Sequence, residues 1–199
     1  MPKKVDHHER RVVIAAALKR VARDQGFDEI SLRHVAAEAE VSLGTVQHYF
    51  RTRDELMAFA LTEIRHSTAA RISAAVAGLG ATPDPRDLLE ATVMQMLALD
   101  EPRRSDVQVA LALLSHTAVH PEVAATLHDE TRAMLDFVAD MIRTAQPTGR
   151  ADPRLDPELT ATGLLAMADG LNNYLLVGHY APDRAVAALR AHLDLIFPG

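Results

Sequence analysis

Residues 42–50 place several hydrogen-bonding side chains in a short segment. If the segment is helical, Val46 and Phe50 lie on one apolar side because they are four residues apart. The polar side chains of the same segment then lie elsewhere on the helix: Ser42, Thr45, Gln47, His48 and Tyr49. Groups of this kind can read the edge of a base or hold a phosphate oxygen. The segment is therefore a candidate nucleic-acid contact.

Two short helices are expected to position these side chains. Ser31 and Ser42 each precede an apolar periodic stretch, and a serine hydroxyl can accept a hydrogen bond from a free backbone N–H of the first helical turn. Small residues such as Ala36 and Ala39 stand where the two helices would cross. Two capped helices joined by a sharp turn are typical of a helix-turn-helix, whose second helix enters the DNA major groove.

A longer pattern surrounds this motif. An apolar first helix is followed, in a fixed order, by Gly26, Phe27, Ser31, Val35, Ala36, Val41, Ser42, Gly44, Thr45, Tyr49, Phe50 and Leu56. Over about residues 14–61 this order resembles the DNA-binding domain of the TetR family of transcriptional regulators. Gln47 stands where the family usually has an aromatic residue, and Arg53 where it usually has lysine. Glutamine can read a base and arginine can hold a phosphate, so the departures leave DNA binding intact but the operator sequence unpredicted.

Roles in DNA binding follow for individual residues. We expect Leu43, Thr45, Gln47 and His48 to face the groove, and Arg33 to hold a guanine edge through two parallel N–H bonds. The predicted DNA-binding residues, including those suited to phosphates, are Arg33, Ser42, Leu43, Gly44, Thr45, Gln47, His48, Tyr49, Arg51 and Arg53. The alternative is that these side chains only solvate an exposed helix.

Composition and charge fit a DNA-binding head on a separate body. Residues 1–53 carry 10 Lys and Arg against 7 Asp and Glu, whereas residues 54–199 carry 11 against 20. Such an asymmetry is typical of a small DNA-binding domain followed by a domain with another task. The chain has no cysteine, signal peptide or membrane-spanning stretch, so we expect a cytoplasmic protein without disulfides or thiolate metal sites.

Helical periodicity, caps and breaks predict an all-α chain of about nine helices. A helix-turn-helix domain of three helices occupies residues 1–51, and a ligand-binding and dimerisation domain of six helices occupies residues 52–199. The expected helices outside the motif are 9–25, 52–77, 85–99, 104–116, 121–145, 157–178 and 182–197. The helix over 104–116 is apolar almost all round, so we expect it to be buried centrally. The polar segment 146–156 is expected to be a mobile crossing.

Two further surfaces are predicted in the body. Small and large apolar residues recur at helical spacing in the last two helices, which predicts a four-helix interface between two copies, as in the family: Gly163, Met167, Gly170, Leu171, Leu189, Leu193 and Ile196. The alternative is that this stripe packs within its own subunit. Flexible thioethers with a few polar groups predict an apolar effector site: Met96, His116, Met134, Phe137, Met141, Asp169 and Asn173. Ordinary core packing of the methionines is the competing interpretation.

The sequence therefore favours a homodimeric regulator, most simply a repressor that a small molecule releases from a palindromic operator. Two other classes compete. One is a helical scaffold whose head binds protein. The other is a metal-dependent enzyme that would use His116, His120 and Glu122. Pro121 interrupts that cluster, and the chain lacks a glycine-rich phosphate loop and a nucleophile elbow, so we expect no enzyme activity, no cofactor and no bound metal.

Overall fold

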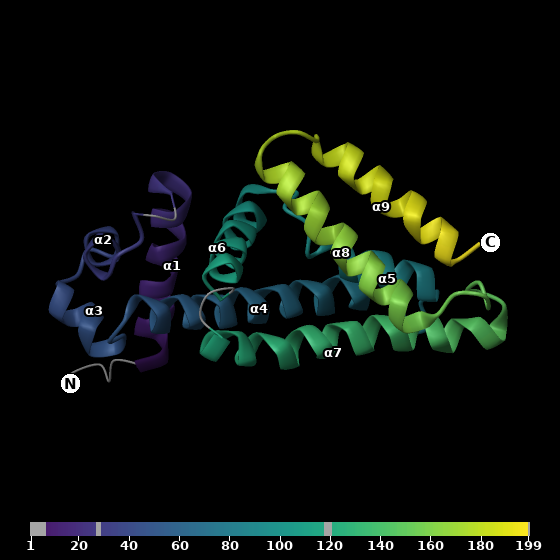
Figure 1. Cartoon of the computed structure of the whole chain (residues 1–199), viewed down its shortest axis with the longest axis horizontal. Helices are drawn as coiled ribbons and strands as arrows, with labels where there is room; N and C mark the ends of the chain where they lie inside the picture. Colours follow the sequence, from purple (N-terminus) through teal and green to yellow (C-terminus); the bar gives the residue numbers. More distant parts are fainter. Residues whose placement is uncertain (1–6, 27–28, 118–120, 199) are drawn as a thin grey trace. The chain divides into compact units, whose positions relative to one another are not determined.

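A computed structural model describes residues 7–26, 29–117 and 121–198, with the side chains of 115–130 outside the description. Within these ranges the chain has nine α-helices, 3-10 turns and no strand (Figure 1), which confirms the predicted all-α fold. The elements are α1 (His7–Gln25), α2 (Leu32–Glu38), α3 (Leu43–Tyr49), α4 (Arg53–Ala77), α5 (Pro85–Met94), α6 (Glu101–Thr117), α7 (Pro121–Ala145), η2 (Gln146–Thr148), α8 (Pro157–Leu176) and α9 (Pro182–Ile196). None of the helices in these ranges has the length and apolar character of a membrane span.

Most helix boundaries lie close to the predicted ones, and capping side chains mark four of the helix starts. Ser31, Ser42, Asp84 and Asp156 each accept a hydrogen bond from a backbone N–H in the first turn of the helix that follows. Two expectations were wrong. The fifth helix ends at Met94 rather than at residue 99, and the sixth begins at Glu101 rather than after Pro102. Proline fits the first turn of a helix, whose N–H groups lack partners anyway. Pro102 therefore lies inside the first turn of α6 instead of separating the two helices.

Two other expectations also change. Leu114 of α6 is 58% exposed in this single chain, so α6 is not buried all round. The segment 146–156 is anchored rather than a free crossing. The Gln146 side chain donates to the carbonyl oxygens of Asp152 and Leu155, and the Asp152 N–H donates to the carbonyl oxygen of Ile196. These bonds join the segment to its own start and to the end of α9.

The described chain divides into two compact units. The first contains α1, α2, α3, the part of α4 up to Ser67, and α6 from Arg104 onward. The predicted division at residues 51/52 concerns function rather than packing, and it stays a prediction. The core of the first unit includes Ile14, Leu18, Val35, Val46, Phe50, Leu56, Val109 and Leu113, all at most 1% exposed.

An ion pair joins α1 to α6 inside this first unit. Lys19 Nζ lies 2.9 Å from Asp106 Oδ1, and the side chains are 31% and 7% exposed, respectively. The neighbouring Ser105 hydroxyl donates to the carbonyl oxygen of Lys19 at 3.4 Å. The polar residues that interrupt the apolar pattern of α6 thus meet a partner on α1.

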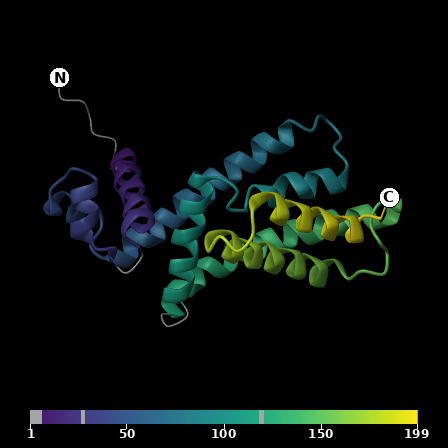
Figure 2. The same ribbon diagram turned by 90° about the horizontal axis from the view of Figure 1, so that it is seen from above.

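The second unit contains the rest of α4 together with α5, α7, α8 and α9. Helix α8 packs against both α7 and α9, and α8 and α9 lie side by side in both views (Figures 1 and 2). The core of this unit includes Leu89, Val93, Leu97, Val138, Ile142, Leu164, Leu189 and Leu193, none of them accessible to solvent.

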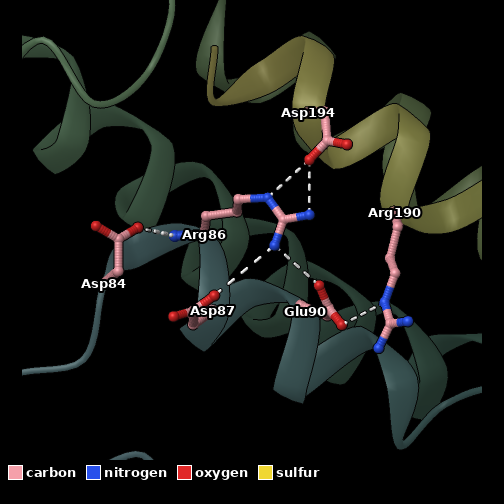
Figure 3. A network of polar contacts seen from close by, with 6 residues as sticks. All are labelled: Asp84, Arg86, Asp87, Glu90, Arg190 and Asp194. Atoms are coloured by element: carbon pink, nitrogen blue, oxygen red, sulfur yellow. Dashed lines mark hydrogen bonds and ion pairs between the residues drawn. The ribbon is translucent and has the colours of Figure 1, made fainter. Parts of the chain in front are cut away.

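A network of side chains joins α5 to α9 near the surface of the second unit (Figure 3). Arg86 of α5 donates to Asp194 of α9 at 2.9 and 2.6 Å and to Glu90 at 3.0 Å. Glu90 also accepts a hydrogen bond from Arg190 of α9 at 2.8 Å. The bonds to Asp194 are the main reason that the pKa of Arg86 is raised, so its charge is firmly held.

A buried amide fixes the segment between α5 and α6 in the same unit. Asn172 of α8 is 5% exposed. Its Oδ1 accepts from the Ala98 N–H at 2.8 Å, and its Nδ2 donates to the Met96 carbonyl at 3.1 Å. Because the backbone here is not helical, these groups need such a partner when they are buried.

Candidate DNA-binding surface

The second short helix, α3, presents its polar side as the sequence predicted. Val46 and Phe50 have no solvent exposure, which confirms that they face the core. The Ser42 hydroxyl accepts from the Thr45 N–H at 3.0 Å and lies 2.8 Å from the Thr45 hydroxyl. The residues predicted to bind DNA are all at least partly accessible: Arg33, Ser42, Leu43, Gly44, Thr45, Gln47, His48, Tyr49, Arg51 and Arg53. Their roles at bases or phosphates stay predictions.

The turn between α2 and α3 is tight. Glu40 adopts a left-handed conformation with a φ of 54°, and the Val41 N–H donates to the Ala36 carbonyl at 3.0 Å. Helix α2 is also tied to α1, because the Arg20 side chain bonds both the carboxylate and the carbonyl oxygen of Glu38. The two short helices are therefore held against α1 by polar as well as apolar contacts.

Arg11 of α1 supports the end of α3. Its guanidinium carbon lies 4.6 Å from the centroid of the Phe50 ring and 4.4 Å from that of Phe59. A cation between two aromatic faces is attracted to both. The same guanidinium lies 3.5 Å from Glu55, whose other carboxylate oxygen accepts from the Arg51 N–H at 2.9 Å. The backbone that follows α3 is thus fixed to α1.

The Thr-x-x-Glu sequence at residues 52–55 is typical of a capping box, and the box at the start of α4 is formed in part. The Thr52 hydroxyl accepts from the Glu55 N–H at 3.1 Å. The Glu55 carboxylate reaches the Arg51 N–H instead of the Thr52 N–H. Sequence reasoning also missed two residues of α1 that contact the end of α3, Arg11 and His7. The His7 ring lies against the Tyr49 ring. Their spacing of four residues on one face of α1 was the available signal.

The predicted effector residues other than His116 are spread over the second unit. Met141 is nearly buried, Met96 and Met134 are partly exposed, and Phe137 is 43% exposed. Asp169 and Asn173 lie on the outward side of α8. The Asp169 side chain is accessible in this single chain, but partial burial of its carboxyl still raises the pKa of that group. The side chains of His116, His120 and Glu122 lie outside the description.

The predicted dimer residues fall into two groups. Leu171, Leu189, Leu193 and Ile196 are at most 7% exposed and pack inside their own subunit. Gly163, Met167 and Gly170 remain accessible. The outward surface of α8 and α9 also includes large apolar side chains that the sequence analysis did not select: Leu159, Val177 and Leu195, which are 73%, 77% and 71% exposed. Among the described side chains, no three His, Asp or Glu form a group that could hold a metal.

The capped helices α2 and α3, with the polar face of α3 turned outward, are typical of proteins that bind DNA through a helix-turn-helix. Two family models agree with this class. One, described as "Bacterial regulatory proteins, tetR family", matches residues 14–59, and the other, described as "BetI-type transcriptional repressor, C-terminal", matches residues 85–198. The chain belongs to the TetR family of transcriptional regulators and has a BetI-type C-terminal domain. It is a regulator and not an enzyme.

Individual relatives support the same assignment. The HTH-type transcriptional regulator PksA of Bacillus subtilis (strain 168) is 28% identical over 199 residues, which cover 98% of this chain and 94% of PksA. The HTH-type transcriptional regulator BetI of Rhizobium meliloti (strain 1021) is 29% identical over 173 residues, which cover 86% of this chain and 80% of BetI.

Solved structures show the same fold. A transcriptional regulator from Rhodococcus sp. Rha1 has a TM-score of 0.80 and 31% identity, covering 94% of this chain and 95% of its own. A transcriptional regulator from Saccharomonospora viridis, determined in complex with choline, has a TM-score of 0.81 and 23% identity, covering 94% and 96%.

Proposed function

We propose that the protein is a homodimeric repressor that binds a palindromic operator through two copies of α3 and leaves it when a small molecule binds the body. The outward polar face of α3, fixed by the burial of Val46 and Phe50, is the observation that carries this proposal. The match of residues 85–198 to a repressor C-terminal domain supports the direction of control. We place this activity in the cytoplasm, with the DNA it regulates.

Base reading and phosphate binding are assigned to different residues in this proposal. Arg33 is exposed near the start of α2 and is assigned to a base edge, and Arg53 at the start of α4 is assigned to a phosphate. Selection of bound duplexes from a random pool gives the operator. Arg33→Ala should then relax preference at one base pair, and Arg53→Ala should weaken all duplexes about equally. Arg132→Ala, an exposed arginine of α7, is the matched control and should change neither.

Salt dependence tests the competing scaffold function. Binding to DNA releases counterions, so log Kd should rise linearly with log salt concentration, with a slope of about 0.9 for each phosphate contacted. A head that binds protein would bind no duplex, or bind it without this dependence. That result would reject the DNA-binding roles assigned to α3.

The outward face of α8 and α9 is proposed as the dimer interface. The exposed Leu159, Val177 and Leu195 supply apolar area, and a Cβ added at Gly163 or Gly170 would meet nothing within 4 Å in the single chain. Gly163→Leu with Gly170→Leu should therefore leave the subunit folded but prevent the close approach of a second copy. Sedimentation should show a monomer for this variant and a dimer for Ala133→Leu, a control at an exposed position of α7. A wild-type protein that is monomeric would contradict the proposal.

An effector is expected to release the dimer from its operator by binding one conformation of the body better than the other. The thioether-rich body favours an apolar molecule. The Saccharomonospora viridis regulator was determined in complex with choline, so choline is the first polar candidate. To test this part, the Kd for the selected operator is measured with and without apolar compounds, and with and without choline. A compound that binds the protein without changing the operator Kd is not the effector.

A further inference from the structure

Three aromatic rings meet beside the polar face of α3. The ring of His7, where α1 begins, lies 4.7 Å from the ring of Tyr49 and 5.6 Å from that of His48, measured between centroids. The His48 and Tyr49 rings are 5.0 Å apart. His7 and His48 are exposed, and Tyr49 is partly exposed. We call these three residues the His7 cluster.

The His7 cluster brings together hydrogen-bond donors suited to an anion. A charged imidazole donates from both ring nitrogens, and a phenol can donate from its hydroxyl. Two charged imidazoles at this separation repel each other, and an anion between or beside them removes the repulsion. In a protein that binds DNA, the anion available at this surface is a backbone phosphate.

The elements that carry the cluster also carry charged side chains of both signs. Glu55 is bound to Arg11 and to the Arg51 N–H. The charged residues closest in sequence on the elements that pack here are Glu9, Arg10, Arg11, Arg51, Arg53, Asp54 and Glu55. Four of these are arginines, which keeps the neighbourhood favourable to a phosphate.

We propose that His7 and His48, together with Tyr49, bind one backbone phosphate of the operator and take up a proton when they do so. The inference rests on the proposed function, adds α1 to the DNA-binding surface, and assigns His48 to a phosphate in place of the groove contact expected from the sequence. Phosphate favours the charged imidazole, so the complex binds more protons than the free protein. Affinity should therefore increase as pH falls through the range in which histidine titrates, and the gain should be lost as pH rises above it.

The test measures the Kd of the full-length protein for a selected duplex between about pH 6 and pH 8 at constant ionic strength. For wild type, we expect Kd at the lower pH to be smaller by about threefold to tenfold for each proton taken up. His7→Gln should reduce this ratio, and His7→Gln with His48→Gln should bring it near one. At the lower pH, His7→Gln should also reduce the salt slope by about one contact.

Matched variants separate proton uptake from ring packing. His7→Phe keeps a ring against Tyr49 and should reduce the pH dependence as much as His7→Gln does, without a loss of thermal stability. His8→Gln and His66→Gln change exposed histidines outside the cluster and should keep the wild-type ratio. Intact DNA binding with an unchanged ratio in His7→Gln would overturn this inference alone. Failure of wild type to bind any duplex would overturn the proposed function and this inference together.

Discussion

The contact between α1 and α6 in the first unit and the contact between α5 and α9 in the second are both made by ion pairs, but they differ in access to water. Asp106 is 7% exposed where it meets Lys19, whereas Asp194 is 62% exposed where it meets Arg86. A buried charge that loses its partner cannot recover full hydration, while an exposed one can. The first pair should therefore matter more for stability, although the second has more hydrogen bonds.

The largest effect is expected for Asp106→Ala. The free energy of unfolding should fall by about 3 kcal/mol, the lower end for a broken buried pair, because Lys19 can still turn partly to water. Urea unfolding followed by circular dichroism measures this. Replacing both partners, as in Lys19→Met with Asp106→Leu, should restore stability to within about 1 kcal/mol, because no charge is left unpaired. A loss below about 0.5 kcal/mol in Asp106→Ala would show that the α1–α6 pair contributes no more to stability than an exposed ion pair.

A smaller effect is expected for Asn172→Ala in the second unit. The variant leaves the buried Ala98 N–H and the Met96 carbonyl without their partner, so we expect a loss of about 2 kcal/mol. The adjacent and exposed Asn173→Ala is the control and should change stability by less than about 0.5 kcal/mol. Equal losses in the two variants would show that burial does not set the cost of a lost polar contact here.

Arg86→Met should cost less again. The network in Figure 3 is partly exposed, so we expect a loss of at most about 1 kcal/mol, which shrinks as salt is added. Thermal unfolding at low and high ionic strength gives both quantities. Asp87→Asn removes a more distant charge, 3.7 Å from Arg86, and should have a smaller effect. A salt-independent loss larger than that of Asp106→Ala would reverse the comparison.

The smallest effect is expected at Asp152. Hydrogen bonds from Arg154 lower the pKa of its carboxyl from 3.8 to about 2. Because the pKa of the folded state is the lower one, the contribution to stability is present above the ordinary pKa of aspartate and is lost as pH falls toward about 2. An NMR titration should give this midpoint, and Arg154→Ala should move it back up toward 3.8. An unchanged midpoint would show that the pair does not form in solution.

Local features of the sequence were enough to predict most of the fold and the side of α3 that faces outward. Val46 and Phe50 lie four residues apart, and the capping residues Ser31, Ser42 and Asp156 directly precede helices. Each of these signals depends on residues close together in the chain. They therefore fix where helices begin and which face is buried, but not which distant helix a face meets.

Contacts between distant residues were not predictable in the same way. Lys19 and Asp106 are both charged residues in mainly apolar helices, and nothing local pairs them. On α9, apolar residues occur on both faces, so periodicity could not distinguish the buried Leu189 and Leu193 from the exposed Leu195. The predicted dimer surface was therefore assigned in part to residues that pack inside the subunit.

The first unit is built from two separated stretches of chain, because α6 from Arg104 onward belongs to it. A fragment that stops at Ser67 would lose Val109 and Leu113 from its core and would leave Lys19 without Asp106. Gene fusions that transplant the first 67 residues onto a foreign sensor should consequently give unstable hybrids. A chimera that also carries the second stretch is the version expected to keep its recognition module intact.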